Sequence, residues 1–159
     1  MKNSAVWVFT ELLKKKRPVK KKFQVDSDLA VVQKTSQEVL NFLKPFPLGD
    51  AALFDIRLCL EEALINAMKY GNGLQKGLPV ELDVEGGRDE VRITIKDQGP
   101  GFDVSKVADC TEEKNLYRNS GRGVYLIHQL MDEVKYNEKG NTLMMVKKIQ
   151  SKAGGNHGS

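Results

Sequence analysis

The chain has 159 residues, of which 40% are hydrophobic and 29% are charged, and its formal net charge is +4. These values are typical of one globular domain, and they exclude collagen-like and wholly disordered chains. No stretch approaches the ~18 apolar residues of a transmembrane helix. Two cysteines without a CxxC pair exclude a disulfide framework and a cysteine-rich metal site. We expect a cytoplasmic protein with reduced thiols.

The positive charge is concentrated at the N-terminus. Residues 1–22 contain eight of the 25 basic residues but only one of the 21 acidic residues, Glu11, which leaves 17 basic and 20 acidic residues in the remainder. The first segment therefore carries +7 and the remainder −3. We expect a solvated basic arm, because runs of like charge usually are solvated. Contact of this arm with a membrane surface or with nucleic acid is the alternative, and no direct nucleic-acid binding is expected of the domain after it.

The folded domain is expected to span residues 23–150. A short strand at 23–25 is followed by Asp26 and Ser27, either of which can cap a helix by accepting bonds from its first free N–H groups. That helix carries an apolar stripe and ends before Pro45, because proline cannot continue a helix.

A second helix is predicted from about residue 53 to residue 70, with Gly71 as its C-terminal cap. It is apolar on most of its circumference, which predicts a helix inside the fold. Arg57 and Glu61 are four residues apart, so we expect them to pair on its wet side.

Alternation of apolar and polar residues predicts a hairpin next. Its inward positions are Val80, Leu82 and Val84 on one strand and Val91, Ile93 and Ile95 on the other, around a turn at 86–89. The residues between them carry opposite charges that can pair across the strands in water. The remaining predicted segments are a polar loop at 103–120, a helix at about 124–131, a hairpin at 134–149 and a flexible tail at 151–159.

This order of elements predicts an α+β fold, with helices on one face of a largely antiparallel sheet. The other face of the sheet is expected to be wet.

Glu62 and Asn66 are four residues apart on the second helix, so they lie on one face, one turn apart. A buried carboxylate and carboxamide need polar partners, a metal or a ligand. By itself this spacing is more often a satisfied structural hydrogen bond.

Three glycine-containing segments come next in the chain. Asp97 begins a Gly-Pro-Gly turn after a strand, and Gly99 and Gly101 let the backbone turn sharply beside a ligand. Gly121-Arg122-Gly123 opens the third helix, where free backbone N–H groups can bind phosphate. Thr142 stands shortly after a glycine in the last hairpin. Each segment alone is a weak signal, but together they indicate a nucleotide site.

The ordered motifs resemble those of the bacterial anti-sigma-factor serine kinases, within the histidine-kinase-like ATPase superfamily. The resemblance covers about residues 23–149 and rests on Glu62-Ala63-Leu64-Ile65-Asn66-Ala67, Asp97-Gln98-Gly99-Pro100-Gly101-Phe102 and Gly121-Arg122-Gly123-Val124-Tyr125-Leu126-Ile127. It implies a two-layer α/β sandwich with a mixed, largely antiparallel sheet.

The resemblance also implies roles for single residues. Asn66 is expected to bind the Mg²⁺ that bridges the ATP phosphates, and Glu62 to act as general base toward a serine hydroxyl or water. Asp97 would accept from the adenine amine, with Gly99 and Gly101 shaping the adjacent wall.

The phosphate end would be formed by later segments. Gly121, Arg122 and Gly123 are expected to line the phosphates at a lid formed by residues 103–120, and Thr142 to close the site. Lys69 and Tyr70 stand where many relatives carry a histidine, so no contact is assigned to them.

The function implied is that of an ATP-dependent serine-protein kinase and anti-sigma factor. It would bind a sigma factor, phosphorylate an antagonist protein and form a homodimer. The alternative is a non-catalytic, ATP-gated switch of the same fold, since nucleotide binding requires Asn66, Asp97 and the glycines but no base.

Overall fold

The computed structural model describes residues 11, 14, 17–103 and 119–150, with the side chains of 119–122 left undescribed. The expected tail at 151–159 and nearly all of the expected lid at 103–120 lie outside the described residues. No helix in the described part is long and apolar enough to span a bilayer.

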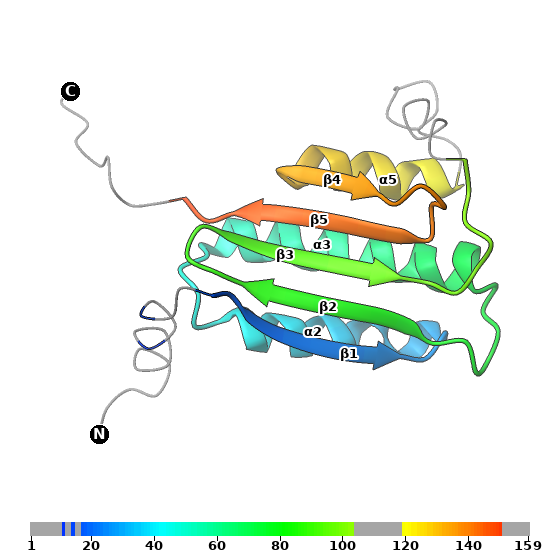
Figure 1. Ribbon diagram of the computed structural model, residues 1–159, viewed down its shortest axis with the longest axis horizontal. Helices are drawn as coiled ribbons and strands as arrows, with labels where there is room; N and C mark the ends of the chain where they lie inside the picture. Colours follow the sequence, from blue (N-terminus) through cyan, green and yellow to red (C-terminus); the bar gives the residue numbers. More distant parts are fainter. Residues whose placement is uncertain (1–10, 12–13, 15–16, 104–118, 151–159) are drawn as a thin grey trace.

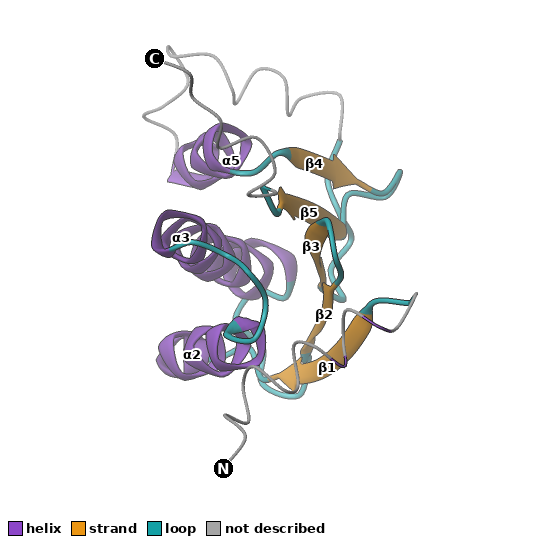
Figure 2. Cartoon of the chain, turned by 90° about the vertical axis from the view of Figure 1, so that its left-hand side faces the viewer, coloured by secondary structure: helices purple, strands orange, loops and turns teal. Residues whose placement is uncertain are grey.

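The described chain folds into two layers, with helices α2, α3 and α5 on one face of a five-stranded sheet (Figures 1 and 2). The strand order is β1-β2-β3-β5-β4, and every pairing is antiparallel. The expected α+β sandwich is confirmed, while the described sheet is antiparallel throughout rather than mixed. The elements are β1 (Val19–Val25), η1 (Leu29–Val31), α2 (Val32–Leu43), α3 (Asp50–Asn66), η2 (Ala67–Gly71), β2 (Val80–Gly86), β3 (Glu90–Lys96), α5 (Asn119–Leu130), β4 (Glu133–Tyr136) and β5 (Thr142–Lys148).

The first strand begins earlier than its sequence suggests. β1 starts at Val19 rather than at Phe23, and its register with β2 runs from Val19 opposite Gly86 to Val25 opposite Val80. Three lysines therefore belong to the sheet. Lys20 points to the wet face, where its Nζ lies 3.1 Å from Glu85 Oε1.

The hairpin of β2 and β3 has the predicted buried face. The six alternating apolar side chains from Val80 to Ile95 are at most 2% exposed. On the other face, Glu81 lies opposite Lys96 and Glu85 lies opposite Arg92. Opposite charges thus face each other across the strands, as the sequence predicts.

The first helix ends before Pro45, as predicted, but the first two helices begin at other residues than expected. Neither Asp26 nor Ser27 caps the first helical segment, because Asp28 accepts a 2.9 Å bond from the N–H of Ala30 at the start of η1. The second helix starts at Asp50, and its last turn, η2, is a wider π-turn. The left-handed residues after this turn are Gly73, with φ +60°, and Leu74, with φ +55°, so Gly71 is not the expected cap.

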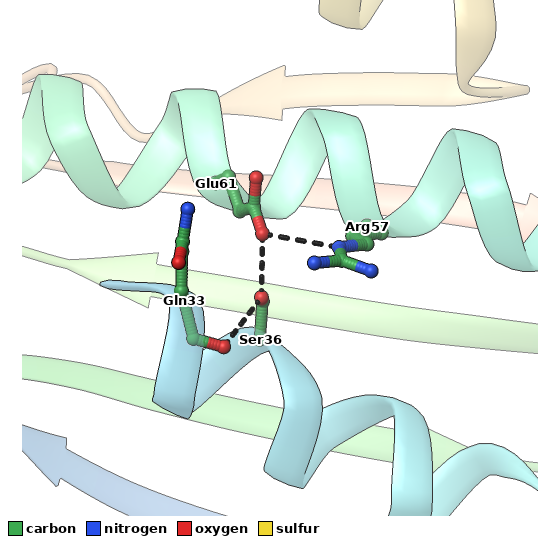
Figure 3. A network of polar contacts seen from close by, with 4 residues as sticks. All are labelled: Gln33, Ser36, Arg57 and Glu61. Atoms are coloured by element: carbon green, nitrogen blue, oxygen red, sulfur yellow. Dashed lines mark hydrogen bonds and ion pairs between the residues drawn. The ribbon is translucent and has the colours of Figure 1, made fainter. Parts of the chain in front are cut away.

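Glu61 links two helices instead of pairing only at the surface. Its Oε1 lies 3.2 Å from Arg57 Nε, as expected, but it also accepts a 2.7 Å bond from the Oγ of Ser36 on α2 (Figure 3). Ser36 is fully buried, and its hydroxyl is also 3.0 Å from the carbonyl of Gln33. The carboxylate therefore helps to fix α2 against α3. The predicted pair with Arg57 is present, but Glu61 is not confined to the solvent-facing side of the helix.

Candidate nucleotide-binding site

A cavity of about 280 Å³ opens where the end of α3 meets the end of β3. Its walls come from segments that are far apart in the sequence. They are Ala63, Asn66, Ala67, Tyr70, Gly71, Ile95, Asp97, Gly101, Phe102, Val124, Tyr136, Gly140, Asn141, Thr142 and Leu143. Asn66 and Asp97 thus face one common space, as a nucleotide site spanning both would require.

Asp97 sits at the rim of the sheet, directly after β3. Its N–H donates to the carbonyl of Asn141 at 2.9 Å, and its Oδ1 accepts from the N–H of Gly99 at 2.8 Å. Burial raises the pKa of this carboxyl above its ordinary value, against the opposing effects of the Gly99 bond and the charge of Lys139. The hydrogen bond from Gly99 occupies Oδ1, and a carboxylate has further lone pairs that can accept from a ligand.

The glycines around Asp97 are required by close packing. A Cβ on Gly71 would overlap the Asp97 carboxylate, and a Cβ on Gly99 would overlap the carbonyl of Gly71. Gly101 has φ +79°, and a side chain there would meet the carbonyl of Lys139. The turn after β3 can therefore lie against η2 and the last hairpin only because these positions lack side chains.

At the other end of the cavity, Glu62 and Asn66 lie against Gly123 of α5. A Cβ on Gly123 would lie 2.7 Å from Glu62 Oε2 and 3.2 Å from Asn66 Nδ2. Asn66 lines the cavity, whereas Glu62 is not among its lining residues. The missing side chain at Gly123 leaves room for the two polar groups beside the helix.

The third helix starts earlier than expected. α5 runs from Asn119 to Leu130, so Gly121, Arg122 and Gly123 lie inside its first turns and do not precede it. The side chain of Arg122 lies outside the described part. The proposed phosphate contacts of Gly121 and Arg122 therefore stay predictions.

Thr142 is held at the cavity by the turn before β5. The Oδ1 of Asn137 accepts from the N–H groups of Gly140, Asn141 and Thr142 at 2.9, 3.0 and 3.1 Å. This arrangement fixes the turn and brings Thr142 and Asn141 to the cavity that Asn66 also lines.

Sequence reasoning missed the aromatic residues of the cavity. Tyr70 is 51% exposed and Phe102 is 44% exposed, and both line the cavity. Phe102 packs edge-on against Tyr136, with ring centroids 5.1 Å apart. Large exposed aromatic side chains beside a cavity are typical of ligand sites. The signal that could have found Tyr70 was its place one turn after Asn66.

The donor set fits Mg²⁺ bound together with phosphates. Among the described residues there is no group of three histidine, cysteine or acidic side chains that could form a complete metal cage. Mg²⁺ usually takes one or two protein oxygens and completes its shell with substrate phosphates and water. The amide of Asn66, which lines the cavity, can supply one such oxygen.

Comparison with known proteins identifies the family. Residues 25–147 match the family described as the histidine kinase-like ATPase domain. Proteins named serine-protein kinase RsbW from Staphylococcus aureus (strain JH9) and from Staphylococcus epidermidis are 34% identical over 113 residues, covering 65% of this chain and 70% of each relative. Among solved structures, a mycobacterial sensor histidine kinase, MprB, aligns with a TM-score of 0.49 and 18% identity, covering 82% of this chain and 97% of that chain.

Proposed function

The chain belongs to the histidine kinase-like ATPase family, with serine-protein kinases among its relatives, and from this membership we propose a specific assignment of its site. The protein is an ATP-using serine-protein kinase with an anti-sigma role. The observation that carries the assignment is the cavity that Asn66 and Asp97 both line.

Asp97 forms the base end of the site. Its carboxylate accepts from the Gly99 N–H, and its backbone N–H donates to the carbonyl of Asn141. The same carboxylate accepts a further hydrogen bond from the exocyclic amine of adenine. Gly99 and Gly101 form the wall beside the base, and Tyr70 and Phe102 border the opening. An acceptor in a partly buried site selects strongly for a base that donates, because a base without the amine leaves the acceptor unpaired.

The phosphate end lies toward α5. Asn66 holds Mg²⁺, which supplies neutralisation of the phosphate charge when bound, while Gly121, Arg122 and Gly123 approach the phosphates and Thr142 closes the site. Glu62 takes the proton from the serine hydroxyl of the acceptor protein. The serine oxygen then bonds to the γ-phosphorus as the bond to the β-phosphate oxygen breaks and ADP leaves.

The partners belong to the same assignment. The protein binds a sigma factor and phosphorylates an antagonist protein on serine, acts in the cytoplasm, and pairs with a second copy of itself. The basic residues before Val19, where β1 begins, lie outside this assignment, and we expect no direct contact of the domain with nucleic acid.

Phosphoryl transfer to the cognate antagonist tests this function. With labelled ATP and Mg²⁺, the wild type should label serine, and Glu62→Gln should lower the rate by about 100-fold without weakening ATP binding, because only proton transfer is lost. Glu61→Gln is the matched control, because that carboxylate bonds Ser36 and Arg57 instead. Absence of transfer to any cognate candidate, or equal rates for Glu62→Gln and wild type, would disprove the kinase assignment.

One observation favours a second candidate, the ATP-gated switch without turnover. Glu62 is not among the residues that line the cavity, whereas Asn66 and Asp97 are. Calorimetry separates the two: tight ATP binding that Asp97→Asn abolishes, with neither hydrolysis nor transfer, would establish the switch.

A further inference from the structure

Asn72, the first residue after the π-turn η2, is a buried polar side chain that the proposed kinase site does not use. It is 4% exposed. A buried carboxamide costs free energy unless its donors and acceptor are satisfied, and each of its two polar atoms has partners in other segments of the fold.

The oxygen of Asn72 contacts the turn that carries Asp97. Its Oδ1 accepts a 2.7 Å hydrogen bond from the N–H of Gln98, the next residue after Asp97. A second bond holds the same turn, since Gln98 Nε2 donates to the carbonyl of Pro79 at 3.2 Å. The backbone that carries the Asp97 carboxylate is therefore fixed from the side of η2.

The nitrogen of Asn72 determines which way the amide faces. Its Nδ2 lies 3.0 Å from Ser27 Oγ, 2.9 Å from the carbonyl of Leu78 and 3.3 Å from that of Pro79. An amide rotated by 180° would place its oxygen against the two carbonyls and its NH₂ against the N–H of Gln98. The surroundings therefore fix Oδ1 toward Gln98.

We infer that Asn72 is a positioning residue for base recognition: by holding the N–H of Gln98, it fixes the Asp97 carboxylate at the place where the adenine amine donates. This inference rests on the proposed ATP site. Asn72 does not line the cavity, so it acts on the base only through Asp97.

The test compares ATP with inosine triphosphate, which carries a carbonyl in place of the exocyclic amine. In calorimetry with Mg²⁺, the wild type should prefer ATP, and Asn72→Ala should lower this preference by about tenfold, mostly by weakening ATP binding. A merely structural role would weaken both nucleotides equally and leave the preference unchanged, which would overturn the inference. Asn72→Ser, whose hydroxyl is too short to replace the amide, gives the same test if the alanine variant fails to fold.

Ser27→Ala is the matched control. It removes the bonds of Ser27 Oγ to Leu78 and Asn72 but leaves the bond between Asn72 and Gln98. It should lower thermal stability and keep the preference for ATP, and an equal loss of preference in Ser27→Ala would contradict the inference. If the wild type bound neither nucleotide, the proposed function itself would fail, whereas tight ATP binding with an unaffected Asn72→Ala would disprove only the role of Asn72.

Discussion

At the scale of single residues, the charge of Asp97 has opposite effects on nucleotide binding and on the stability of the fold. Burial raises its pKa in the folded protein, so the folded state favours the neutral carboxyl. The protonated Asp97 carboxyl therefore contributes its full stabilisation of the folded state only below the unfolded pKa of about 3.9. This stabilisation is lost as the pH rises through the higher pKa of the folded state. At neutral pH the charged form costs stability but provides the acceptor.

Replacing this carboxyl should separate the two effects. Asp97→Asn keeps an oxygen for the N–H of Gly99 and removes the buried charge, so its melting temperature should exceed that of the wild type at pH 7 but not at pH 3. ATP affinity should fall by about tenfold or more, because the amide NH₂ opposes the adenine amine. Calorimetry and thermal unfolding at both pH values measure this, and a lower melting temperature at pH 7 would show that the charge is stabilising.

Gly123 gives a second prediction at this scale. In Gly123→Ala the new Cβ would lie 2.7 Å from Glu62 Oε2, so the carboxylate must move. Phosphoryl transfer should fall by about 10- to 100-fold, while stability should change little because alanine favours a helix by about 1 kcal/mol over glycine. Gly49→Ala, with nothing within 4 Å of its Cβ, is the control. Equal transfer rates in the two variants would show that the position of Glu62 tolerates the shift.

The sequence predicts individual site residues unevenly. The motifs have recognisable spacing, and four of the residues predicted from them line the cavity, namely Asn66, Asp97, Gly101 and Thr142. Asn72 has no such signal, since its importance depends on Gln98 and Leu78, which only tertiary folding brings close.

At the scale of elements, the carboxylate of Glu61 adds a polar link to the apolar packing between α2 and α3. Glu61→Ala removes the charged acceptor of the buried Ser36 hydroxyl and leaves it only the Gln33 carbonyl, and we expect a loss of about 1–2 kcal/mol in the free energy of unfolding. Arg57→Ala removes only a half-exposed partner and should cost under about 1 kcal/mol. Chemical denaturation measures both variants. A larger loss for Arg57→Ala would mean that the surface pair, and not the bond to Ser36, dominates.

Elements with one buried face could be predicted, and edge elements could not. The alternation in β2 and β3 reflects a core on one side and water on the other. In β1 three consecutive lysines conceal the pattern, because an edge strand exposes most of its side chains. The π-turn η2 escapes sequence-based prediction because helical periodicity assumes 3.6 residues per turn.

At the scale of the whole molecule, the register of β1 changes where the folded domain is expected to begin. A chain that starts at Pro18 keeps the complete pairing with β2, whereas one that starts at Phe23 loses the four register pairs from Val19 to Lys22. The first should melt within about 2 °C of the full chain, and the second should lose on the order of 2 kcal/mol. Thermal unfolding of both proteins measures this. Equal stability would support a domain that starts at residue 23.

The five residues of η2 also determine how Asn66, before the turn, is oriented relative to Asn72, after it. Each residue rotates the chain by about 100° in an α-helix and by somewhat less in the wider π-turn, so a deletion within 67–71 would turn Asn72 away from Gln98 while Asn66 stayed in place. The exposed, left-handed Gly73 and Leu74 follow this turn, and the N–H of Leu74 still bonds the carbonyl of Met68. The spacing of six residues between Asn66 and Asn72 is therefore expected to tolerate neither an insertion nor a deletion.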